Sequence, residues 1–192
     1  MTRGIAIALL LGAMVAAQTP ESTWLDRPLT NWNTSGRAMP PRVGNGESIA
    51  EITRRCAFLP MKRNTEGERA VADAGWLPFH MFDRQIIERD VEIVGGLAGA
   101  DAMCRPVDFN IFVFVGGRLA GTLSPSEMAS RTDGSIGGAI RFADDAVSAE
   151  FARYAAPDAI CCPSERVTVR YRIDRKESPP VVVPVGVQPT RR

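Results

Sequence analysis

The segment Phe109-Asn-Ile-Phe-Val-Phe-Val115, followed directly by Gly116-Gly117, gives the clearest structural signal in the chain. Its residues are apolar on both sides of an extended backbone, with Phe109, Ile111, Val113 and Val115 on one side and Phe112 and Phe114 on the other. This pattern is typical of a central strand in a sheet that is covered on both faces. The two glycines predict a tight turn into a second strand over residues 118–123. The sequence therefore predicts a β-hairpin at the centre of the fold.

Period-two alternation predicts further strands on both sides of this hairpin, at residues 90–94, 136–142, 147–154 and 166–174. The last of these is the most regular, because Val167, Val169, Tyr171 and Ile173 alternate with Arg166, Thr168, Arg170 and Arg172. We expect the apolar set to face the core and the polar set to face solvent.

Capping boxes predict short helices. Ser48 with Glu51 precedes a helix over 49–56, and Thr65 with Glu68 precedes one over 66–74, which ends before Gly75. The same spacing at Ser124-Pro-Ser-Glu127 predicts a single helical turn. The sequence thus predicts an α+β fold: an antiparallel sheet of about five strands with short helices packed on one face, reinforced by disulfides.

Residues 1–17 are predicted to be a signal peptide, because Arg3 precedes an uncharged apolar run that ends in the small-residue pair Val15 and Ala17. The run is short for a membrane span, which needs about 20 residues. We therefore expect the mature protein in the periplasm or secreted, without stable membrane insertion once the signal is removed. An uncleaved N-terminal anchor is the alternative.

The rest of the chain divides into three parts. Residues 18–46 are expected to form an extended arm that docks through Trp24 and Trp32, although the Asn31-Trp32-Asn33 triplet could instead form a sugar platform. Residues 47–175 are predicted to form a single α+β domain. Residues 176–192 are predicted to be a Pro/Val-rich flexible tail, because prolines at this density preclude a central strand.

The chain has four cysteines, Cys56, Cys104, Cys161 and Cys162, and an even number in an exported protein predicts disulfides. Three pairings are open. A bridge between the neighbours Cys161 and Cys162 closes a strained eight-atom ring, and adjacent side chains of an extended segment point to opposite sides. We therefore favour a pairing in which Cys56 and Cys104 each bond one of the adjacent pair. No C-x-x-C pair is present to indicate thiol redox catalysis.

Composition argues against several kinds of function. The formal net charge is +1, from 23 Lys and Arg against 22 Asp and Glu, so no nucleic-acid partner is expected. One histidine, with the cysteines oxidised, does not build a metal site, and no cofactor is predicted. His80 and Asp83 could orient a base in a hydrolase, but no G-x-S-x-G motif accompanies them.

The candidate site is cationic. Arg166, Arg170 and Arg172 share the outward side of one predicted strand, and Arg141 and Arg153 lie on strands expected near it. Guanidinium groups bind carboxylate and phosphate in bidentate fashion. This pattern favours a surface that binds an acidic polymer or a protein of the envelope.

The loop at Arg131 and Asp133 is the second candidate contact for such a partner. The alternative for the strand arginines is a solvated sheet face that Glu150 and Glu165 neutralise across strands.

Several ordered motifs carry a family resemblance. They are Asp101-Ala-Met-Cys104-Arg-Pro106, the hairpin from Phe109 to Pro125, Ser130-Arg-Thr-Asp-Gly134, and Arg153-Tyr-Ala-Ala-Pro-Asp-Ala-Ile-Cys161-Cys-Pro-Ser164 with the strand that follows. Over residues 90–174 the chain resembles the LppP/LprE family of bacterial envelope lipoproteins and its non-lipidated relatives. It lacks the cysteine at the cleavage site that carries the lipid in anchored members.

The resemblance implies an envelope location and no particular active site. We therefore expect a non-catalytic, exported envelope protein with a binding or scaffolding role. The alternatives are a periplasmic inhibitor of an extracellular enzyme and a hydrolase that uses His80.

Overall fold

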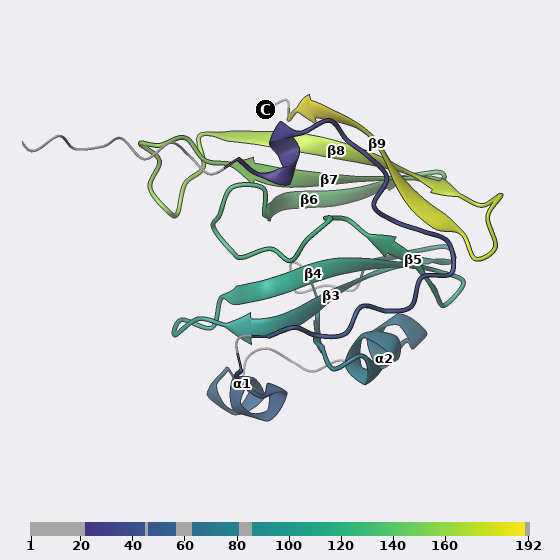
Figure 1. The fold of residues 1–192 in the computed structure, drawn as a ribbon, viewed down its shortest axis with the longest axis horizontal. Coiled ribbons are helices and arrows are strands. Elements are labelled where there is room, and N and C mark those ends of the chain that lie inside the picture. The colour runs from purple at the N-terminus through teal and green to yellow at the C-terminus, as the bar shows by residue number, and fades with distance from the viewer. Residues whose placement is uncertain (1–21, 45, 57–62, 81–85, 191–192) are drawn as a thin grey trace, which may run out of the picture.

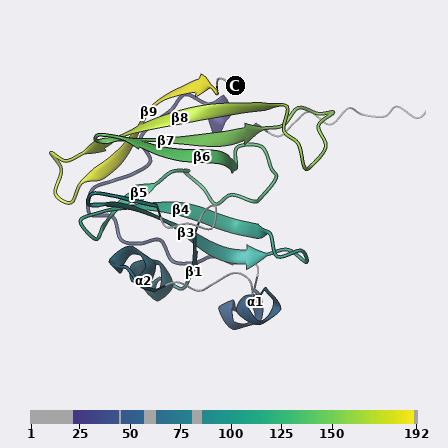
Figure 2. The ribbon, with the colours of Figure 1, turned by 180° about the vertical axis from the view of Figure 1, so that it is seen from behind.

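Two antiparallel sheets stack face to face, and both helices lie outside the first sheet (Figure 1 and Figure 2). The computed structural model describes residues 22–44, 46–56, 63–80 and 86–190. The predicted signal peptide and Asp83 lie outside the described residues. The fold is mostly antiparallel sheet with two short helices, as predicted, but the strands form two sheets instead of one.

The first sheet has the order β1-β3-β4-β5, with β2 also paired to β3. Its strands are β1 (Leu77–Phe79), β2 (Ile86–Glu88), β3 (Val91–Ala100), β4 (Pro106–Val115) and β5 (Arg118–Thr122). The predicted central hairpin is confirmed, since Val115 pairs with Arg118 across the two glycines. Strand β3 continues through Gly95 and Gly96, where the sequence predicted its end. Side chains at these two positions would collide with the rings of Phe79 and Phe112, so the glycines permit close packing inside the strand.

The second sheet has the order β6-β7-β8-β9. Its strands are β6 (Ile136–Ala143), β7 (Ala146–Arg153), β8 (Glu165–Asp174) and β9 (Val181–Pro189). The flexible-tail prediction is wrong for β9, which pairs with β8 from Val181 to Pro189. Proline does not prevent this pairing because β9 is the last strand of its sheet, where a missing N–H donor is tolerated.

The core lies between the sheets. Ile111 and Val113 of β4 belong to the same buried cluster as Phe151 of β7 and Tyr171 of β8. The opposite side of β4 packs under α2, where Phe112 and Phe114 form a second buried cluster with Val71, Trp76, Val94 and Ala98. Strand β4 is therefore covered on both faces, as its sequence predicted.

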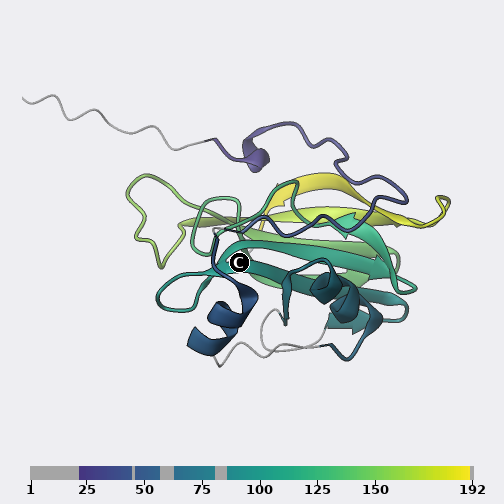
Figure 3. The same ribbon diagram turned by 60° about the horizontal axis from the view of Figure 1, so that its bottom comes forward.

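The helices begin where the capping boxes predicted. Helix α1 (Ile49–Arg55) follows Ser48, and α2 (Glu66–Asp73) follows Thr65, with both reciprocal capping hydrogen bonds present in each. Figure 3 shows both helices on the same side of the first sheet. The helical turn predicted at Ser124 is absent. Residues 123–126 instead form bends, and Met128 then exchanges two backbone hydrogen bonds with Phe109 of β4.

The N-terminal arm, residues 22–44, runs along the side where β5 and β9 approach each other (Figure 1). It includes a short 3-10 helix, η1 (Trp24–Asp26). The Trp24 ring lies edge-on to Phe151 at 5.0 Å, and the Trp32 ring lies edge-on to Tyr171 at 6.3 Å. Both indoles thus pack against the core cluster between the sheets.

Candidate functional site

Four arginines lie on the outer face of the second sheet, and we call them the arginine face: Arg141 on β6 and Arg166, Arg170 and Arg172 on β8. All four side chains are exposed, while the alternate residues Val169, Tyr171 and Ile173 are buried. Because α1 and α2 cover the first sheet, they leave this face open (Figure 2).

Two of these arginines pair with carboxylates. Arg141 Nη1 lies 2.5 Å from Glu150 Oε1, and Arg172 Nη1 lies 2.8 Å from Asp174 Oδ2. The hydrogen bond from Arg172 lowers the pKa of the Asp174 carboxyl. Within the described part of the chain, neither Arg166 nor Arg170 has an ion pair. Glu150 therefore neutralises part of the face, as the alternative interpretation expected, and two guanidinium groups remain available.

The arginine face is hollowed at one end. Arg141, Glu150 and Arg166 line an open depression of about 690 Å³ together with Thr190. In the depression, Arg141 pairs with Glu150, and the Arg166 guanidinium and the Thr190 hydroxyl are donors of the kind that carboxylate and phosphate oxygens require.

The loop at residues 130–134 is not part of this face. Asp133 Oδ1 accepts a hydrogen bond from the Tyr154 N–H at 2.7 Å and lies 3.2 Å from Arg153 Nε. Arg153 also binds Asp26 of η1 at 2.5 Å, and this hydrogen bond lowers the pKa of Asp26. Asp133 and Arg153 thus hold the arm in place, whereas Arg131 is exposed with a left-handed backbone, at φ 64°.

His80 pairs with a buried carboxylate of α2, whereas Asp83, its candidate partner in a hydrolase, lies outside the described residues. Nε2 of His80 lies 2.5 Å from Oε1 of Glu68, a fully buried carboxylate that also accepts the N–H groups of Asn64 and Thr65. Burial raises the pKa of Glu68, but the hydrogen bonds from His80 and these two N–H groups outweigh it and lower the pKa. His80 therefore helps to fix the start of α2.

The favoured cysteine pairing is wrong. The structure joins Cys56 to Cys104, with an S–S distance of 2.03 Å, and Cys161 to Cys162. The preference assumed that Cys161 and Cys162 lie in an extended segment. They instead lie in a turn closed by a hydrogen bond from the Cys162 N–H to the Ala159 carbonyl at 2.8 Å.

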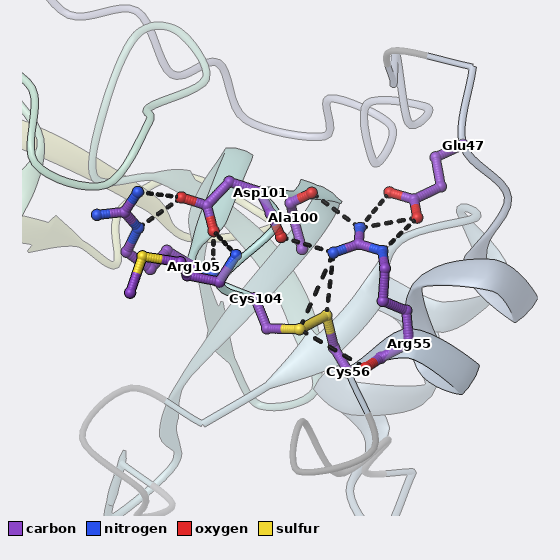
Figure 4. The surroundings of a disulfide bond; sticks show 8 residues. Glu47, Arg55, Cys56, Ala100, Asp101, Cys104 and Arg105 are labelled. Carbon is purple, nitrogen blue, oxygen red and sulfur yellow. Dashed lines mark hydrogen bonds and ion pairs between the residues drawn. A yellow bond between two sulfur atoms is a disulfide. The ribbon is translucent and has the colours of Figure 1, made fainter.

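The Arg55 guanidinium lies beside the Cys56–Cys104 bridge, as Figure 4 shows. Its Nη2 lies 2.8 Å from each of the two carboxylate oxygens of Glu47. The same guanidinium donates to the carbonyls of Ala100 and Asp101 at 2.9 and 2.6 Å. The disulfide and this guanidinium together fasten α1 to the turn between β3 and β4. Their role is structural.

A groove beside the arm was not predicted from the sequence. Asn110 on β4 lines it, and this side chain is 6% exposed on the face that otherwise carries Phe112 and Phe114. An asparagine inside a doubly apolar strand was the available signal, because a buried amide is costly unless it is hydrogen-bonded.

The fold and the site define a class of protein: an antiparallel β-sandwich with a disulfide-tethered helix and an exposed cationic face. Residues 92–176 match the family model described as LppP/LprE lipoprotein, which confirms the resemblance over this segment. The matched residues run from β3 to just beyond β8 and leave out the arm, both helices and β9. No curated protein and no solved structure matched the chain.

The family match is consistent with a cell-envelope protein of unknown activity. Among the helices that the structure describes, none is long and apolar enough to cross a membrane. The same residues contain no group of three or more His, Cys, Asp or Glu side chains placed to hold a metal ion.

Proposed function

We propose that this protein is an exported, non-catalytic component of the cell envelope that binds an acidic polymer through the arginine face. The observation that carries the proposal is the pair Arg166 and Arg170, which are exposed on an uncovered sheet and have no ion pair within the described residues. A guanidinium that lacks an internal partner keeps its bidentate donors for a ligand.

Strand geometry supports a polymeric partner. Alternate residues of a strand lie about 7 Å apart on the same side, so Arg166, Arg170 and Arg172 follow one another along the outer side of β8. A chain with regularly repeated carboxylates or phosphates offers several contacts to such a row at once. Multiple weak contacts then add up to useful affinity.

The test measures binding of poly-L-glutamate and of polyphosphate to the purified protein by fluorescence anisotropy. Replacing Arg166 and Arg170 by Gln should weaken binding by about tenfold, which corresponds to about 1.4 kcal/mol. The matched control replaces Arg63 and Arg118, two exposed arginines outside the arginine face, and should change binding less than about twofold. Equal losses in both variants, or no binding of either polymer, would contradict the proposal.

A second candidate function is inhibition of an extracellular enzyme by the loop between β7 and β8. This loop projects beyond the strands in Figure 1 and Figure 2. It presents Ile160 with 69% exposure, and it is braced by the Cys161–Cys162 bond and by a hydrogen bond from Tyr154 Oη to the Ile160 carbonyl at 2.9 Å. Ile160→Asp should abolish inhibition of secreted hydrolases, whereas Met103→Asp, at an equally exposed site, should not.

A further inference from the structure

We infer that the groove beside the arm is a binding site for a neutral pyranose saccharide. The groove has a volume of about 490 Å³, within the range of about 300–1,000 Å³ that is usual for ligand sites. It lies between the arm, strands β4 and β5, and residues 125–127 of the following loop. It is therefore separate from the arginine face, and the inference does not depend on the proposed function.

Two tryptophans line the groove; Trp32 is partly exposed and forms its apolar wall, whereas Trp76 is 3% exposed and supports the lining from within. Trp32 Nε1 donates to the Thr122 carbonyl at 3.1 Å, and Trp76 Nε1 donates to the Pro40 carbonyl at 2.9 Å. Trp76 also lies edge-on to Phe112 at 5.4 Å. With its N–H group satisfied internally and its ring held in place, the Trp32 indole offers apolar surface to a ligand without an entropic cost of ordering.

The floor is polar. Asn110 Oδ1 accepts the Ile111 N–H at 2.8 Å, but the amide nitrogen makes only a 3.5 Å contact with the Ser126 carbonyl. The amide carries two N–H donors, so this nearly buried group retains donor capacity at the base of the groove. An acceptor oxygen from a ligand would satisfy it.

The rim carries one charge of each sign. Arg37 makes a 3.5 Å contact with the Trp32 carbonyl, and Glu127 is a second exposed charged residue in the lining of the groove. Partial burial and the neighbouring Asp108 raise the pKa of Glu127. The two charges offset each other, which favours a neutral ligand over an anion.

Together these features match the chemistry of a pyranose ring. The C–H face of a sugar packs on an indole, and its hydroxyls pair with planar amide, carboxylate and guanidinium groups that donate or accept. A purely apolar ligand would leave Asn110 unsatisfied, and an acidic one would meet Glu127. A saccharide segment satisfies the wall, the floor and the rim at the same time.

The test titrates the full-length protein with the neutral tetrasaccharides of N-acetylglucosamine, glucose (β-1,4 linked) and glucose (α-1,4 linked), followed by tryptophan fluorescence and calorimetry. At least one should bind. Arg37→Ala with Glu127→Gln should weaken that binding by about tenfold or more, and both residues are exposed, so folding should be preserved. The control, Arg141→Gln on the arginine face, should leave saccharide binding unchanged.

Three results would overturn the inference: no binding of any tetrasaccharide, binding that the rim variant does not weaken, or binding that Arg141→Gln weakens equally. Tighter binding of a zwitterionic dipeptide than of every saccharide would also overturn the assigned ligand class. Loss of polyanion binding with intact saccharide binding would count against the arginine face alone.

Discussion

Glu68 is the residue at which protonation and stability are most directly linked. Its folded pKa lies below the usual value of 4.5, because hydrogen bonds from His80, Asn64 and Thr65 outweigh the effect of burial. The folded state therefore takes up a proton less readily than the unfolded state. The stability that this carboxylate contributes is present above its unfolded pKa and is lost as the pH falls through its folded pKa.

We therefore predict that acid destabilises the wild type more than Glu68→Gln. Urea unfolding measured at about pH 6 and about pH 3 should show a larger loss for the wild type, because Gln has no proton to gain. Glu66→Gln, which changes an exposed neighbour, serves as the control and should behave like the wild type. Equal acid sensitivity of Glu68→Gln and the wild type would contradict the prediction.

The two disulfides should differ in their effect on stability. Cys56–Cys104 spans 48 positions, so its loss should cost about 4 kcal/mol on the entropic account, within a usual range of about 2–5 kcal/mol. The Cys161–Cys162 bridge joins neighbouring residues and closes no long loop, so its removal should lower the free energy of unfolding far less. Guanidinium unfolding of the two double Cys→Ser variants measures the difference, and non-reducing peptide mapping checks the pairing.

At this scale, the sequence indicated the cysteines and His80 but not their partners, whereas Glu150 was expected to neutralise the strand arginines and pairs with Arg141. The partner of His80 is Glu68 on α2, which residue spacing did not indicate, while Asp83 lies outside the described residues. The favoured cysteine partners were wrong. In both cases the partner depends on how elements pack, and residue spacing does not contain that information.

Elements were predictable where local pattern and tertiary pairing agree. Both helices, the central hairpin and β8 follow directly from capping boxes, glycines and alternation. The failures occur where pairing overrides a local rule. The capping box at Ser124 gives way to the backbone pairing of Phe109 with Met128, and the proline-rich stretch after residue 180 becomes β9 because β8 offers it an edge.

Strand β9 allows a comparison of two valines on one element. Val182 is fully buried, whereas Val185 is 52% exposed. Val182→Ala should lower the free energy of unfolding by about 2 kcal/mol, from lost burial and the cavity left behind. Val185→Ala should change it by less than about 0.5 kcal/mol. Denaturant unfolding of both variants decides whether β9 is docked, because a mobile tail would make the two substitutions equally silent.

The whole molecule depends on contacts between its two sheets. An antiparallel strand with one apolar face fits equally well in a single sheet covered by helices or in one half of a sandwich. The alternation of β6, β7 and β8 therefore could not distinguish these arrangements. What distinguishes them is the shared core cluster, in which residues of both sheets and the two arm tryptophans meet.

Asn33 of the arm is the clearest point at which the two sheets are joined. Its side-chain nitrogen donates to the Thr122 carbonyl of β5 at 3.0 Å and to the Val182 carbonyl of β9 at 2.9 Å. Its side-chain oxygen accepts the Thr122 N–H at 2.9 Å. The side chain is 6% exposed, so no solvent replaces these bonds if it is lost.

We predict that Asn33→Ala destabilises the protein by about 2–4 kcal/mol, because it leaves backbone groups of both sheets buried without partners. Asn31→Ala is the matched control: Asn31 is exposed and, among the described residues, its side chain bonds within the arm to Asn33, so its loss should cost less than about 1 kcal/mol. Asn33→Ala should also expose the arm to limited proteolysis, and it should weaken saccharide binding, because Asn33 and Trp32 line the groove. If Asn33→Ala unfolds at the same denaturant concentration as Asn31→Ala and its arm resists protease equally, the arm does not join the sheets.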